Sequence, residues 1–310
     1  MSMLECGAEF ARCESNLSNR FDGFWRRAGE NTEIKPAIPR QHLRMIRKPV
    51  TQVWSLGANA MPSPSSEDPV LILIHGAAGN GRMWDAVRRE LSPRWRVIAP
   101  DLPGHGARRG EAFSLQGAVD TVVAAARSVA PAPVVVGGDS LGGYTSLASA
   151  QALPPSQLQG LMLAGCTANM VGGALRALLI RQVLLVAMGT LLGAKRMANL
   201  TAKELRNMGI ADEDVNAQVT AGFNHGVFPQ AVRALRGTDF RAKLAAVTQP
   251  VMIVNGAKDK IFVDQEASFV AVAKRATCHR FADCEHGVSL RRSREFAALV
   301  NNFVLGLGTE

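Results

Sequence analysis

Short apolar runs alternate with longer amphipathic stretches along most of this chain. Most of these runs have the length and the apolar composition of a buried strand, and the predicted strands lie at residues 70–74, 96–99, 134–136, 161–164, 251–255 and 277–281. The stretches between them have helical character, at residues 83–91, 114–130, 144–152 and 292–307. The alternation predicts an α/β fold with a mostly parallel central sheet and helices on both faces.

The alternation stops between residues 166 and 246. This stretch predicts only helices, at residues 171–193, 201–208, 212–221 and 229–236. A block of helices between two strands indicates an inserted cap over the strand ends. We therefore divide the chain into an N-terminal extension without a motif (1–45), a core (46–165 and 247–310) and a helical cap (166–246). A further strand is predicted at 50–56.

The run at 134–136 leads into the sequence VVVGGDSLGG, in which Gly138 and Gly142 flank Ser140. This spacing suits a sharp strand-to-helix turn whose apex has a strained backbone and whose neighbours have no room for side chains. The turn would expose the Ser140 hydroxyl at a helix N-terminus. A turn without chemistry and a nucleophilic Asp139 are the alternatives, although Asp139 at the apex would put Leu141 where a small residue is needed.

A nucleophilic serine needs a general base and a carboxylate that orients it. His286, in DCEHGV, follows the last predicted strand and comes after Ser140 in the sequence. Asp259, in NGAKDKIF, follows the preceding strand, and it is also a common type of turn residue. Asp264, farther along that loop, is expected to cap the next helix.

These motifs together resemble the α/β-hydrolase family, on its serine esterase or enol-lactonase-like branch. The matching segments are HGAAG at 75–79, DLPGHG at 101–106, GDSLG at 138–142, GAKD at 256–259 and His286. The resemblance implies a triad of Ser140, Asp259 and His286, and an oxyanion hole formed by the N–H groups of Ala77 and Leu141. It implies no metal and no organic cofactor. His75 is expected to brace its loop.

Composition limits the class of protein. The 310 residues are 47% apolar and 20% charged, which is typical of a globular chain. The net charge of +9 is scattered and aromatic residues make up 5%, so a nucleic-acid partner is not expected. Five cysteines without metal-ligand spacing suit a reducing compartment.

We expect a cytoplasmic protein without stable membrane insertion. The N-terminus has no apolar signal-peptide core, and the apolar stretch 183–194 is too short to span a bilayer. The longer apolar segment 175–192 is interpreted either as a helix packed against the core or as an apolar roof over a substrate. Membrane docking by this helix is a weaker alternative, because its polar face is thin.

The function that the resemblance implies is a serine hydrolase that cleaves a carboxylic ester of a small to medium hydrophobic substrate through an acyl-enzyme on Ser140. A carbon–carbon bond hydrolase, thioesterase or lyase with the same triad is the alternative, and a non-catalytic ligand-binding protein is a third. The sequence indicates neither the natural substrate nor the oligomeric state.

Overall fold

The computed structural model describes residues 68–307, so the N-terminal extension and the strand predicted at 50–56 lie outside the described residues. Six strands form one sheet in the order β2-β1-β3-β4-β5-β6, and every neighbouring pair is parallel. Their bounds are β1 Val70–Ile74, β2 Val97–Ile98, β3 Val134–Asp139, β4 Leu158–Ala164, β5 Val251–Gly256 and β6 Ala276–Phe281. The predicted parallel sheet is confirmed.

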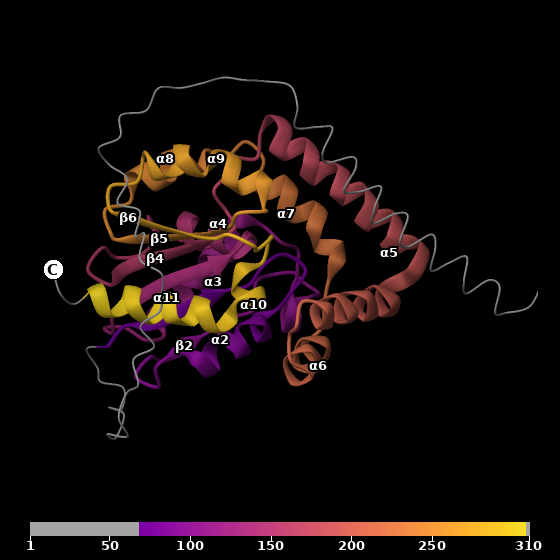
Figure 1. The fold of residues 1–310 in the computed structure, drawn as a ribbon, viewed down its shortest axis with the longest axis horizontal. Helices are drawn as coiled ribbons and strands as arrows, with labels where there is room; N and C mark the ends of the chain where they lie inside the picture. Colours follow the sequence, from indigo (N-terminus) through magenta and orange to yellow (C-terminus); the bar gives the residue numbers. More distant parts are fainter. Residues whose placement is uncertain (1–67, 308–310) are drawn as a thin grey trace, which may run out of the picture. The chain divides into compact units, whose positions relative to one another are not determined.

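Helices cover both faces of the sheet (Figure 1). Alternate residues of β1 point to opposite faces, so Ile72 packs in one apolar cluster and Leu73 in the other. The first face is covered by α3 Leu115–Arg127, α4 Leu141–Ser149, α8 Phe240–Ala246 and α9 Lys260–Val270. The second is covered by η1 Gly81–Trp84, α2 Asp85–Glu90, α10 Val288–Arg291 and α11 Ser293–Gly306. A short turn of helix, η2 Gly106–Arg108, follows β2.

Helices alone occupy the chain between β4 and β5. They are α5 Gly172–Asn207, α6 Asp212–Ala221, η3 His225–Val227, α7 Phe228–Leu235 and α8. Two predicted helices are joined in α5, which is interrupted only by a kink at Gly193 with φ 75°. We refer to α5, α6, η3 and α7 as the cap helices. Helix α7 lies beside α5, between it and the sheet (Figure 1).

The expected length of the apolar segment was wrong. Within residues 68–307, α5 is the helix long and apolar enough to cross a membrane, because the apolar stretch begins well before residue 183. None of its most apolar 18-residue window is buried, which disfavours the interpretation of this segment as a helix packed against the core, although Leu178 contacts the core cluster. Among the described residues most large exposed apolar side chains belong to α5 or to its N-cap residue, namely Val171, Leu179, Ile180, Val183, Leu184, Val186, Met188, Leu191 and Leu200.

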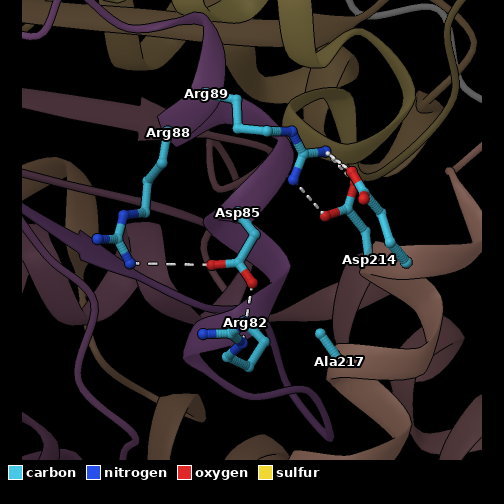
Figure 2. Close-up of a pocket in the computed structure, with 7 residues that line it drawn as sticks. Arg82, Asp85, Arg88, Arg89, Asp214 and Ala217 are labelled. Carbon is cyan, nitrogen blue, oxygen red and sulfur yellow. Dashed lines mark hydrogen bonds and ion pairs between the residues drawn. The ribbon is translucent and has the colours of Figure 1, made fainter.

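Polar contacts join the cap helices to the core. Arg89 of α2 makes a bidentate ion pair with the buried Asp214 of α6, at 2.5 and 2.8 Å. This pair borders a cavity of about 410 Å³ between η1, α2 and α6 (Figure 2). Arg82 and Arg88 pair with Asp85 in the same cavity. The charges of this cavity are thus mutually compensated, and it forms part of the seam between the cap helices and the core.

Candidate active site

Ser140 stands at a strained turn between β3 and α4. Its φ of 56° and ψ of −117° lie in a region that residues with side chains rarely adopt. A methyl group on Gly142 would lie 2.0 Å from the carbonyl oxygen of Ile74, and one on Gly138 would lie 2.3 Å from the carbonyl carbon of Gly142. The predicted lack of room on both sides of Ser140 is confirmed.

Asp259 and His286 are joined by a hydrogen bond of 2.6 Å between Oδ2 and Nδ1. Asp259 follows β5 and His286 follows β6, so both loops lie at the carboxyl edge of the sheet, where β3 delivers Ser140. The N–H of Lys258 donates to the carbonyl of Cys284 at 3.0 Å, which holds the two loops together. Asp264 lies inside α9, so the expectation that it caps this helix was wrong: Asp259 is at the N-cap position.

The imidazole of His286 is packed between two neighbours. It stacks on Phe262 with ring centroids 5.0 Å apart. On another side, a methyl group on Gly165 would lie 3.1 Å from its Cε1. Gly165 follows Ala164, whose carbonyl accepts the N–H of Ser140 at 2.8 Å. His286 is therefore positioned beside the backbone that carries Ser140.

The charge of the site favours a protonated His286. Burial would lower the pKa of His286, but the hydrogen bond to Asp259 and the charges of Asp259 and Asp139 outweigh it, so the pKa is raised above 6.5. An imidazole in this environment is a stronger base than a free one. The neighbouring carboxylates also stabilise the imidazolium that forms when the ring takes up a proton.

Asp139 is a second carboxylate of the site, and the sequence did not reveal its partner. It is 1% exposed, and its Oδ2 accepts hydrogen bonds from the N–H of Ser289 at 3.2 Å and from its hydroxyl at 2.5 Å. Burial raises the pKa of this carboxyl, and the charge of His286 opposes the rise. Because the carboxylate is directed to Ser289, the geometry disfavours Asp139 as the nucleophile.

The turn after β1 lies against Ser140. A methyl group on Gly76 would lie 3.7 Å from Cβ of Ser140, and Ala77 is the next residue. Among the described residues, no group accepts a hydrogen bond from the N–H of Ala77 or of Leu141. Both donors are thus free to bind another acceptor, and their role as an oxyanion hole stays a prediction. His75 braces the turn as predicted, because its Nε2 accepts the N–H of Leu102 at 3.1 Å.

Two asparagines connect this turn to the cap helices, and neither was predicted. Asn80 donates through Nδ2 to the carbonyls of Gln218 and Gly222, both at 3.0 Å. The N–H of Asn224 donates to the carbonyl of Ala78 at 3.1 Å. The Gly-rich motif at residues 75–79, which Asn80 directly follows, marked this turn, but no local pattern pointed to partners more than 130 residues away.

The cap helices also bring a cation toward the triad. Arg181 of α5 lies over the ring of Phe228, with 5.8 Å between its Cζ and the ring centroid. Burial lowers the pKa of Arg181, and the negative charge of Asp259 opposes this effect. Within residues 68–307, no cluster of three or more His, Cys, Asp and Glu side chains could hold a metal ion.

Comparison with known proteins adds independent information. Residues 71–299 match the alpha/beta hydrolase family. A pimeloyl-[acyl-carrier protein] methyl ester esterase from Aromatoleum aromaticum is 27% identical over 264 residues, covering 77% of this chain and 99% of that protein. The protein of the same name from Nitrosomonas europaea is 28% identical over 241 residues, covering 74% and 93%.

Solved structures show the same fold. An esterase from Thermogutta terrifontis superposes with a TM-score of 0.63 at 20% identity, covering 79% of this chain and 92% of that one. E-2-(acetamidomethylene)succinate hydrolase superposes with a TM-score of 0.64 at 20% identity, covering 78% and 92%.

Proposed function

Because this chain belongs to the alpha/beta hydrolase family and is a serine ester hydrolase, we propose that it cleaves carboxylic esters of small to medium hydrophobic acids with Ser140, His286 and Asp259. The observation that carries the proposal is the 2.6 Å hydrogen bond between His286 and Asp259 at the sheet edge where the strained Ser140 stands.

The chemistry follows from the roles of these groups. Ser140 Oγ attacks the ester carbonyl while Nε2 of His286 accepts its proton. Asp259 holds Nδ1 of the imidazole and stabilises the positive charge that forms. The N–H groups of Ala77 and Leu141 stabilise the oxyanion, and one such donor typically lowers the barrier by about 3 kcal/mol. His286 then protonates the departing alcohol and activates the water that releases the acid.

An apolar acyl group is supported by the apolar composition of α5, the helix that the chain inserts between β4 and β5. Leu178 of this helix packs against the core cluster that also contains Leu141 and Phe262. An aliphatic chain gains about 0.8 kcal/mol for each CH₂ that it buries against apolar side chains. The names of the matching relatives support an ester, and in particular a methyl ester, as the bond that is cleaved.

Labelling and turnover test the proposal. A fluorophosphonate probe is expected to modify Ser140 in the native chain and to leave Ser140→Ala unmodified. With p-nitrophenyl esters of increasing chain length, kcat/KM is expected to rise from acetate to octanoate. Labelling that persists in Ser140→Ala contradicts the proposed nucleophile. Equal kcat/KM values for the acetate and octanoate esters contradict the apolar substrate.

A further inference from the structure

The outward face of α5 is an apolar surface without a partner in the described part of the chain. Leu178, Leu185 and Leu192 face inward and are partly buried. Val183 and Leu191 point outward and are 65% and 82% exposed. Leu179, Ile180 and Val186 are exposed on the same side of the helix. We call these five outward residues the α5 apolar face.

The charges around this face have one sign. From Gly172 to Lys203 the chain carries no Asp or Glu. The exposed cations Arg176, Lys195, Arg196 and Lys203 stand before and after the apolar face. Within residues 68–307 no carboxylate forms an ion pair with any of these four. An apolar strip between cations that have no carboxylate partner in the described part of the chain is complementary to a surface with an apolar interior and anionic headgroups.

The topology excludes a membrane-spanning role for α5 in this fold. The segment from Gly172 to the kink at Gly193 is about 30 Å long at 1.5 Å per residue, which would be enough to cross the apolar core of a bilayer. However, β4 before the insertion pairs with β5 after it. A hydrogen bond from Asn80 to the carbonyl of Gln218 also holds α6 against the core. Both ends of α5 therefore stay on the same side, and the helix can only lie in the plane of an interface.

We propose that the α5 apolar face docks reversibly onto anionic phospholipid surfaces, with α5 parallel to the membrane plane. Outward apolar side chains enter the headgroup region while the flanking cations contact lipid phosphates. Docking in this orientation presents the cap side of the hydrolase to the bilayer. It does not depend on the triad, so it stands or falls separately from the proposed ester hydrolysis.

Vesicle flotation of the full chain tests the proposal. The chain is expected to float with phosphatidylcholine vesicles that contain phosphatidylglycerol, to bind pure phosphatidylcholine more weakly, and to lose binding as salt increases. The double variant Val183→Gln/Leu191→Gln is expected to bind roughly tenfold more weakly or worse, since it removes two large apolar contacts. Lys195→Gln/Arg196→Gln is expected to lose the preference for the anionic vesicles.

Leu305→Gln is the matched control. Leu305 is 52% exposed on α11, outside the α5 apolar face, so its loss should leave flotation unchanged. All variants are expected to hydrolyse a water-soluble short-chain ester at the native rate, which shows that they are folded. Absence of flotation, or flotation equal in the native chain and the Val183→Gln/Leu191→Gln variant, overturns the proposal. The proposal is also overturned if the native chain binds no vesicles and forms a dimer that Val183→Gln/Leu191→Gln dissociates. In that case the α5 apolar face binds a second copy of the chain.

Discussion

At the scale of single residues, charged groups from three parts of the chain act on one imidazole. Asp139 raises the pKa of His286 and Arg181 lowers it, while Asp259 raises it through both its hydrogen bond and its charge. These groups come from β3, from a cap helix and from the loop after β5. The basicity of His286, the proposed general base, therefore depends on residues outside the proposed triad.

This arrangement predicts opposite shifts from two neutral substitutions. Asp139→Asn removes a negative charge near His286, lowers its pKa and moves the acid limb of the kcat/KM profile to lower pH. Arg181→Gln removes a positive charge, raises that pKa and moves the limb to higher pH. The measurement is kcat/KM against pH on a water-soluble ester. Shifts in the same direction, or no shift in either variant, would refute the electrostatic account.

At the scale of elements, the turn between β3 and α4 depends on close approach of backbone to backbone. The helix α4 begins directly under β1, and only a glycine at 142 allows this approach, because a Cβ there would lie inside the carbonyl group of Ile74. Ser140, two residues before Gly142, has its positive φ in this closely packed turn. The strained backbone at Ser140 thus accompanies the close packing of α4 against β1.

Gly142→Ala is expected to destabilise the fold strongly, because backbone atoms of β1 cannot move aside as a flexible side chain could. The cost should be about 3 kcal/mol or more in the free energy of unfolding. Gly189→Ala is the control: Gly189 lies within α5 with open space around it, and alanine there should stabilise the helix by about 0.5–1 kcal/mol. Urea unfolding midpoints measure both, and similar midpoints for the two variants would exclude the steric explanation.

The sequence predicted those parts of the fold and of the candidate site that leave a local pattern of residues in the chain. Strand runs and the residues that follow them, such as Asp259 and His286, could be placed because parallel strands deliver their ends to one edge. The pairing of Asp139 with Ser289 spans 150 residues, and no local pattern records it. The exposure of α5 was also missed, because apolarity on every side gives no direction to a helix.

At the scale of the whole molecule, two buried histidines make folding sensitive to acid. The rings of His75 and His105 lie 4.7 Å apart, and both side chains are fully buried. Burial, followed by the charge of His75, lowers the pKa of His105 to about 3. Burial also lowers the pKa of His75. Both histidines are therefore neutral in the folded protein at pH values where the unfolded chain binds protons.

Stability should consequently fall as the pH decreases from about 6.5 toward 3, because the unfolded state takes up protons that the folded state excludes. His286 has the opposite sign: its raised pKa adds stability below about 6.5 that is lost as the pH rises through its folded value.

His105→Asn separates the contribution of the buried histidines to the pH dependence of stability from that of His286. The asparagine amide can still donate a hydrogen bond to the Pro103 carbonyl, as Nδ1 of His105 does at 2.9 Å. The melting temperature of this variant should fall less steeply than that of the native chain between about pH 6.5 and pH 4. An unchanged slope would contradict the role of this histidine, and His279→Asn at the partly buried edge strand β6 provides the comparison.

The hydrogen bonds from Asn80 and Asn224 have a consequence for anyone who redesigns this scaffold. They couple the segment that would select a substrate to the loop that would stabilise the developing negative charge. Libraries that randomise residues 218–224 to change selectivity will therefore also alter turnover, whereas changes on the outer side of the long insertion helix will leave the rate of bond cleavage intact. A variant selected for a new substrate therefore needs its turnover rate measured as well.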